Sequence, residues 1–202
     1  QGHNKIKIIL ASQNKNKVIE FNKIFNSLPI TFIPLSNFTK KSPHETGKSY
    51  KENALIKAKN AGYHSNWKFP CLADDSGLSI KILSNQPGIY SSRWAFKDNY
   101  LNAFSLIKSK IKEKGQSIQG QSASFNCCLA LVYNPNRKYI FDGVLEGHLT
   151  FPPRGKKGFG YDPIFIPHNS KKTLAEITNT EKNKISHRKL ALDKLKEFLF
   201  EK

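Results

Sequence analysis

The chain of 202 residues has few cysteines, few acidic side chains and no long apolar run. Its cysteines are Cys71, Cys127 and Cys128, an odd number with neither C-x-x-C nor zinc-ligand spacing. This pattern argues against a disulfide framework and against a structural zinc site. Because each cysteine lies within an apolar stretch, we expect all three to be buried as free thiols.

No apolar stretch reaches the length that a membrane-spanning helix requires, and residues 6–11 are too few for the apolar core of a signal peptide. We therefore expect a cytoplasmic protein with no membrane partner. Residues 1–4 lack an initiating methionine and are expected to be an N-terminal extension or an expression remnant. Residues 5–202 then suit one domain with a sizeable core.

Acidic side chains are scarce beside basic ones: 15 Asp and Glu stand against 33 Lys and Arg, a formal charge of +18. Such a charge is typical of proteins that bind polyanions, so one alternative is a nucleic-acid-binding protein without catalytic turnover. The basic residues are scattered rather than gathered in one arm. A solvated, lysine-rich surface explains them better, and nucleic acid is not the expected partner.

Hydrophobic periodicity and turn residues predict an α/β fold with a mixed sheet. Strands are predicted over Lys5–Ala11, Thr31–Leu35, a run ending at Asp74, Leu78–Leu83, Ser122–Tyr133 and Lys138–Thr150. Helices are predicted over Asn14–Leu28, Ser49–Gly62, Asn99–Lys114 and Ser186–Phe200, and Phe151–Pro167 is predicted to be a loop.

Two adjacent carboxylates, Asp74 and Asp75, end the apolar run that begins at Pro70. Because neighbouring strand residues point to opposite faces, one of the two is expected to enter a pocket while the other anchors backbone. Magnesium sites commonly combine one or two carboxylates with waters and phosphate oxygens. The alternative is a turn in which Asp caps backbone N–H groups and Gly77 takes a positive φ.

Three further segments carry polar groups suited to a nucleotide. The loop Ser12–Lys17 precedes a predicted helix, where phosphate binding is favoured, although an ordinary capped loop has the same composition. Asn53 and Lys57 are one helical turn apart, with Glu45 upstream, and a solvated helix face is the alternative. Gly158–Pro163 holds an aromatic ring between glycines, which suits stacking on a base or a buried turn.

Together these segments resemble the inosine/xanthosine triphosphate pyrophosphatase family, in particular its bacterial members. Six ordered motifs carry the resemblance: Ala11–Asn14 with Lys17 and Glu20, Glu45–Gly47 with Glu52–Ala54 and Lys57–Ala58, Ala73–Leu78, Pro87–Arg93, Gly158–Phe165 and Ser186–Arg188.

The resemblance implies an elongated mixed β-sheet with flanking helices, in two lobes around a central nucleotide cleft. It also implies a homodimer that uses Mg²⁺ to hydrolyse ITP, dITP and XTP to the nucleoside monophosphate and pyrophosphate, removing them from the nucleotide pool. The same fold acting on another modified nucleotide stays open. Selectivity is expected to depend on donors that suit a 6-oxo group and that a 6-amino group leaves unpaired.

By matched position, the predicted catalytic residues are Asp75, Lys17 and Lys57. The expected metal ligands are Asp75 with Glu45 as first choice of partner and Glu20 as second, since His44 stands where relatives often have an acid. Whether Asp75 or a metal hydroxide activates the water stays open. The predicted substrate contacts are Ser12, Gln13, Asn14, Lys15, Asn16, Lys17, Asn53, Ser76, Phe159, Gly160, Tyr161, Asp162, Lys182, His187 and Arg188.

Overall fold

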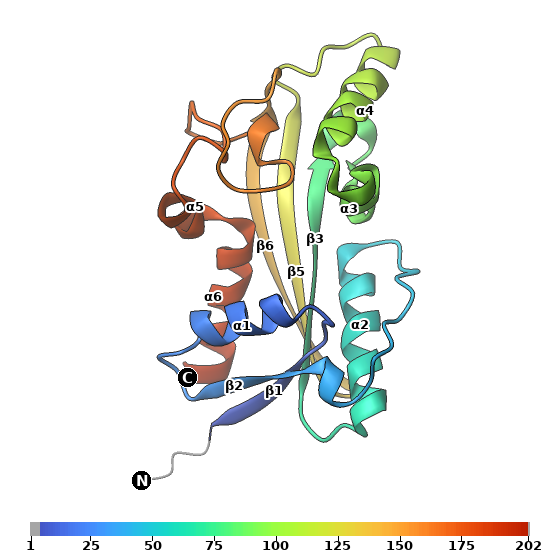
Figure 1. Ribbon diagram of the computed structural model, residues 1–202, viewed down its shortest axis with the longest axis vertical. Helices are drawn as coiled ribbons and strands as arrows, with labels where there is room; N and C mark the ends of the chain where they lie inside the picture. Colours follow the sequence, from blue (N-terminus) through green and yellow to red (C-terminus); the bar gives the residue numbers. More distant parts are fainter. Residues whose placement is uncertain (1–4, 202) are drawn as a thin grey trace. The chain divides into compact units, whose positions relative to one another are not determined.

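A computed structural model of the chain describes residues 5–201 and shows a mixed seven-stranded sheet with helices packed on it (Figure 1). The strand order is β2-β1-β3-β5-β6-β7, and β4 pairs with β3. The strands are β1 (Ile6–Leu10), β2 (Ile30–Pro34), β3 (Cys71–Ile80), β4 (Gln86–Pro87), β5 (Ser122–Asn134), β6 (Arg137–Leu149) and β7 (Phe165–Pro167).

The helices are α1 (Lys15–Ile24), α2 (Tyr50–Ser65), α3 (Ser91–Trp94), α4 (Tyr100–Glu113), α5 (Asn179–Ile185) and α6 (His187–Phe200). The sheet is mixed because β1 runs parallel to β2 and β3, whereas β3–β4 and β6–β7 are antiparallel. The predicted fold class, α/β with a mixed sheet, is confirmed. Among the described residues, none of the helices has both the length and the apolar character to cross a membrane.

The chain divides into two compact units, and the division falls within β3, β5 and β6. Unit 1 contains residues 5–75 and Cys128–Phe141, and unit 2 contains Ser76–Cys127 and residues 142–201. Asp75 and Ser76 are therefore covalent neighbours that belong to different units.

Unit 1 is held together by an apolar core on β1 and the inner faces of its two helices. Helix α1 contacts β2 and helix α2 contacts β1 (Figure 1). Ala54, Ala58 and Ala61 recur at helical spacing and are completely buried, so α2 approaches the sheet closely. Cys71 and Cys128 lie in the same core, and Cys127 is also buried, which confirms the prediction of free, buried thiols.

Unit 2 has its own core between β3, α4 and the segment around β7. Helix α4 contributes Ala103, Phe104, Ile107 and Ile111, whose spacing of three and four residues forms one apolar stripe. Phe165 of β7 packs on Phe125 of β5, with ring centroids 4.6 Å apart.

The predicted strand end at Asp74 is wrong. Strand β3 continues without a break through the Asp74–Gly77 segment to Ile80, and its far end pairs with β4. The separate strand Leu78–Leu83 and the alternative of a capped turn are therefore wrong as well, and Lys81–Leu83 is a 3₁₀ turn. Asp, Ser and Gly disfavour strands locally, but pairing with neighbouring strands overrides that preference.

The predicted end of the second helix at Gly62 is also wrong. Helix α2 continues to Ser65 and ends where Asn66 takes a left-handed conformation. Gly62 instead makes room for Trp67, because a Cβ atom there would lie 2.1 Å from the indole ring. Helix α5 and strand β7 were missed, because seven and three residues are too few to show a period.

Candidate active site

The loop after β1 is shaped by its own side chains before it enters α1. Asn14 caps the helix, and its side chain accepts a hydrogen bond from Asn16 N at 2.9 Å. Ser12 Oγ accepts from Asn14 N at 3.1 Å. Gln13 Nε2 donates to the carbonyl oxygens of residues 39 and 41, so its amide holds the loop to a neighbouring segment. The loop therefore presents the exposed Lys15 and Asn16 at a helix N-terminus, a position that favours phosphate.

Asp74 contacts both of the lysines that are predicted to be catalytic. Lys17 Nζ lies 2.5 Å from Asp74 Oδ1, although the residues are 57 positions apart. Lys57 Nζ donates to the carbonyl oxygen of Asp74. Asp74 lies within β3 and forms an ion pair, so its side chain does not cap a turn.

Asp75 lies with Lys57 and Glu45 in a cluster that we call the acid–lysine cluster. Lys57 Nζ is 3.4 Å from Glu45 Oε1 and 3.7 Å from Asp75 Oδ1. Burial raises the pKa of the Asp75 carboxyl to about 6, with Lys57 opposing the rise and the Glu45 and Asp74 carboxylates adding to it. Within the described part of the chain, Asp75 Oδ2 is buried without a hydrogen-bond partner. A buried acceptor of this kind is typical of a ligand site.

Asn53 links Asp75 to the loop that carries Glu45. Its side chain is 2% exposed, and its Oδ1 accepts from Gly47 N at 2.8 Å. It also hydrogen-bonds the side chain of Asp75. A Cβ atom on Gly47 would lie 2.6 Å from Asn53 Oδ1, so glycine is needed for this approach. Asn53 and Lys57, one turn apart on α2, thus bring the segment that carries Glu45 against Asp75.

The donors of the acid–lysine cluster fit Mg²⁺, which prefers carboxylate oxygens. Glu45 is among the charges that act on Asp75, whereas Glu20 lies exposed on α1 and is not among them. This arrangement favours Glu45 over Glu20 as the carboxylate that would hold the metal together with Asp75. Across residues 5–201, no three or more His, Cys, Asp or Glu side chains are grouped to hold a metal. Asp75 and Glu45 would supply two ligands, and waters and phosphate oxygens would complete the coordination.

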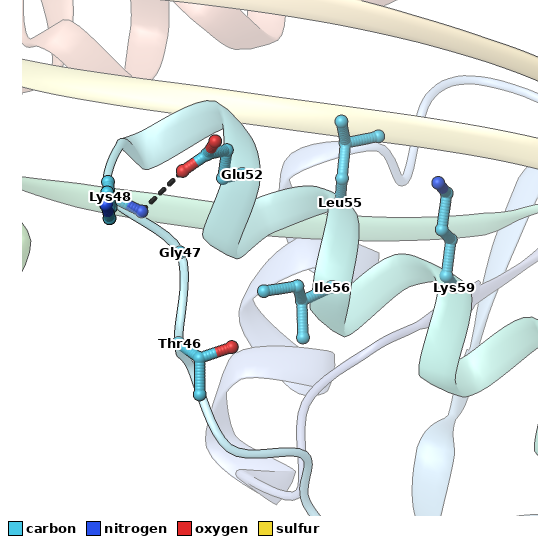
Figure 2. Close-up of a pocket in the computed structure, with 7 residues that line it drawn as sticks. All are labelled: Thr46, Gly47, Lys48, Glu52, Leu55, Ile56 and Lys59. Carbon is cyan, nitrogen blue, oxygen red and sulfur yellow. Dashed lines mark hydrogen bonds between the residues drawn. The ribbon is translucent and has the colours of Figure 1, made fainter.

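A pocket of about 530 Å³ opens on the neighbouring face of α2 (Figure 2). Its lining is Thr46, Gly47, Lys48, Glu52, Leu55, Ile56 and Lys59. Figure 2 shows the Glu52 carboxylate turned back to the main-chain N–H of Lys48. This hydrogen bond links the first turn of α2 to the residues just before the helix. None of the predicted catalytic residues lines this pocket, so we do not assign it to the nucleotide.

In unit 2, the segment Gly158–Asp162, which we call the base loop, is built around one buried carboxylate. Asp162 Oδ2 accepts from Lys182 Nζ at 2.5 Å and from Phe159 N at 3.0 Å. Gly158 has φ +71°, and a Cβ atom there would lie 2.2 Å from the same oxygen. The glycine and the ion pair therefore determine one shape for the loop.

The two aromatic residues of the base loop differ in role. The Phe159 side chain is 75% exposed, and the ammonium of Lys182 lies 4.3 Å from the centroid of its ring. An exposed ring held on a cation suits stacking against a flat ligand. Tyr161 is buried, donates its hydroxyl hydrogen bond to the carbonyl of Ser91, and packs edge-on against Tyr100. Its side chain therefore anchors the loop from inside.

The remaining predicted contacts lie in unit 2, three of them at the start of α6 and one within β3. Ser186 caps α6, and the adjacent His187 ring stacks on Phe125 with centroids 5.1 Å apart. Arg188 is half-buried in the first turn of α6, and Ser76 is exposed on β3 directly after Asp75. Sequence reasoning missed Arg154 and Glu176, which form an ion pair near the base loop. They are 22 residues apart in unremarkable composition, so no local signal marked them.

Comparison with known proteins gives matches along nearly the whole chain. A sequence model of the Ham1 family matches residues 8–198. The dITP/XTP pyrophosphatase of Coxiella burnetii is 43% identical over 198 residues, covering 97% of this chain and 98% of the relative. The protein of the same name from Treponema denticola is 41% identical over 195 residues, covering 96% and 98%. A solved HAM1 protein structure from Coxiella burnetii has a TM-score of 0.88 at 41% identity, covering 98% of this chain and 100% of the other.

Proposed function

The chain belongs to the Ham1 family, and on that premise we propose that it hydrolyses dITP, XTP and ITP to the nucleoside monophosphate and pyrophosphate. The observation that carries the proposal is the acid–lysine cluster, in which Lys57 is shared between Glu45 and Asp75. Its relatives are named as dITP/XTP pyrophosphatases, and nearly the full length of each is matched.

We assign the triphosphate to unit 1. Lys17 and Lys57 hold carboxylates and a main-chain carbonyl, and the same ammonium groups bind phosphate oxygens when the nucleotide enters. Asp75 and Glu45 would hold Mg²⁺, which when bound neutralises phosphate charge and so assists attack at phosphorus. Lys17 and Lys57 add positive charge where negative charge develops in the transition state.

Asp75 has the properties of a group that orients the attacking water and accepts its proton. Burial raises the pKa of the Asp75 carboxyl to about 6 in the metal-free protein, so until Mg²⁺ is bound this carboxyl accepts a proton more readily than an ordinary aspartate. Its Oδ2 atom has no hydrogen-bond donor in the described residues, so it is the oxygen that we assign to the water. Asn53 and Lys57 hold the carboxyl in place meanwhile.

We assign the purine to unit 2, where the exposed ring of Phe159 offers a stacking surface. Lys182, buried beside Asp162, supplies a cation beneath that ring. On the resemblance alone, we also propose that the enzyme is a homodimer and acts in the cytoplasm.

The test is pyrophosphate release from ITP, dITP and XTP compared with ATP and GTP, each with Mg²⁺ and again with excess chelator. We expect turnover of the first three only, and its loss when the metal is removed. Equal rates on all five substrates would contradict the selectivity, and full activity in chelator would contradict the role of Mg²⁺. Turnover of another modified nucleotide alone would support the alternative in which the same fold acts on a different substrate.

A further inference from the structure

Two loops of unit 2 are joined by a cluster that neither the sequence motifs nor the proposed mechanism uses. Arg154 Nε and Nη2 both lie 3.1 Å from Glu176 Oε1, and Nη2 also donates to the carbonyl of Lys171 at 2.6 Å. Thr173 Oγ1 donates to the carbonyl of Arg154 at 2.7 Å, and Thr173 N donates to Glu176 Oε1 at 2.9 Å. We call Arg154, Thr173 and Glu176 the brace.

The main chain of the two loops that the brace joins contacts both ends of the base loop. At the C-terminal end of the loop, the carbonyl oxygen of Pro163 accepts a hydrogen bond from Arg154 N at 2.9 Å. At the N-terminal end of the loop, Lys157 N donates to the carbonyl oxygen of Ala175 at 2.9 Å. Gly155 has φ +94°, and a Cβ atom there would lie 2.3 Å from the Ala175 oxygen, so the two backbones are in direct contact. The segment with Phe159 at its centre thus begins against the main chain next to Glu176 and ends against the main chain of Arg154.

We propose that Arg154 is a positioning residue for base recognition, which through Glu176 and Thr173 holds the base loop in the orientation that a purine stacks on. The inference rests on the proposed function, because it takes the base loop as the purine site. Arg154 touches no reacting atom and acts only through the loop.

The exposure of the brace separates this role from a general role in stability. The Arg154 and Glu176 side chains are 41% and 31% exposed, so solvent screens their attraction and the pair adds little to global stability. The loop interior is held independently by Asp162 and Lys182. Removing the Arg154 side chain keeps the main-chain hydrogen bonds at both ends of the base loop but removes the ties to Glu176 and to the carbonyl of Lys171, so the two loops are held together less firmly. Small displacements of a binding group cost much affinity.

The test compares Arg154→Met with the wild type in two kinds of experiment. In steady-state kinetics with dITP, KM should rise on the order of 10-fold while kcat stays within about threefold. In calorimetric titrations, the affinity for inosine monophosphate should fall by a similar factor, whereas the affinity for inorganic pyrophosphate, which lacks a base, should not change. Arg154→Lys keeps the charge but not the fork of donors, so it should recover part of the loss.

The matched control is Lys189→Met, which breaks an ion pair of comparable exposure on α6, Lys189 with Asp193. It should alter neither KM nor nucleotide affinity. If Arg154→Met fails to fold, Glu176→Gln removes the charge with little change of shape and should give the same pattern.

An unchanged affinity for inosine monophosphate in either brace variant overturns the inference, as does an equal loss of pyrophosphate affinity. A wild type that hydrolyses none of the five triphosphates contradicts the proposed function instead, and the inosine monophosphate titration still decides the inference. A wild type that hydrolyses dITP but binds no inosine monophosphate overturns the inference and leaves the proposed function in place.

Discussion

The two units hold their charges in different ways. In unit 1, Lys57 is shared between two carboxylates at 3.4 and 3.7 Å, and Asp75 keeps one buried oxygen without a donor in the described chain. In unit 2, Lys182 and Asp162 form one pair at 2.5 Å, with side chains 11% and 5% exposed. The same residue types thus form an open cluster around Asp75 and a closed pair around Asp162, while Lys17 and Asp74 form a second short pair in unit 1 that is more exposed than the pair in unit 2.

The difference is consistent with the ligand parts that we propose for each unit. Long, shared contacts are exchanged readily for phosphate oxygens or a metal ion, so the open cluster suits a charged ligand. A closed, buried pair is costly to disturb and instead determines the shape of the loop around it. In unit 2 that shape leaves the Phe159 ring exposed, which suits a flat and uncharged part of the ligand.

The largest expected effect comes from removing the carboxylate of the open cluster. Asp75→Asn should lower kcat for dITP by about 10³-fold or more, because the variant can neither hold a metal ion nor accept a proton. Single-turnover kinetics would measure the loss, with Asp193→Asn on α6 as the control. A variant that keeps a tenth of the wild-type rate would remove Asp75 from the chemistry.

Breaking the closed pair should act on stability. Lys182→Met leaves the Asp162 carboxylate buried without its cation, and we expect a loss of about 3 kcal/mol in the free energy of unfolding. Urea unfolding would measure it. Adding Asp162→Asn to Lys182→Met should recover part of the loss, because the uncompensated charge is then gone. No change in the single variant would mean that unit 2 does not depend on a closed pair.

The exposed ring tests the assignment of the base to unit 2. Phe159→Ala should lower kcat/KM for dITP about 10-fold, since stacking of a base on an aromatic ring contributes roughly 1–3 kcal/mol. Phe159→Trp should retain most of the activity. Affinity for pyrophosphate, measured by calorimetry, should be the same in all three proteins. A matching loss of pyrophosphate affinity would contradict the division of labour between the units.

The smallest expected effect is the pH dependence of stability in unit 1. The pKa of Asp75 is about 6 in the folded protein against an ordinary value of 3.8. The Asp75 carboxyl thus holds its proton more tightly in the folded state than in the unfolded state. Ionising this carboxyl lowers the free energy of unfolding as the pH rises from about 4 to about 6. After allowance for screening, Asp75→Asn should be more stable than the wild type by about 1–2 kcal/mol above pH 6.5.

Below pH 4 that difference should vanish, because Asp75 is then protonated in both states. Chemical denaturation at pH 3.5, 5 and 7.5 would follow it. An advantage of Asp75→Asn that does not depend on pH would mean that burial is not what raises the pKa of this carboxyl.

Local spacing predicted which residues of α2 share one face. Asn53 and Lys57 were placed on one helix face because they are four residues apart, and the structure has both reaching the segment around Asp75. Spacing did not reveal that Lys17 pairs with Asp74, since partners 57 residues apart meet only through the pairing of β1 with β3. It also missed the brace, whose members belong to two separate loops.

The sequence by itself determined the features that depend on neighbours along the chain. These include the helix caps at Asn14, Ser49, Asn99 and Ser186, each a short polar side chain that satisfies free N–H groups of the next turn. Only the tertiary structure decided that β3 continues through the Asp74–Gly77 segment and that Asp75 is buried beside Lys57. Strand pairing and desolvation depend on residues far away in the sequence. No local pattern could therefore determine that Lys17 pairs with the side chain of Asp74 and Lys57 with that of Asp75.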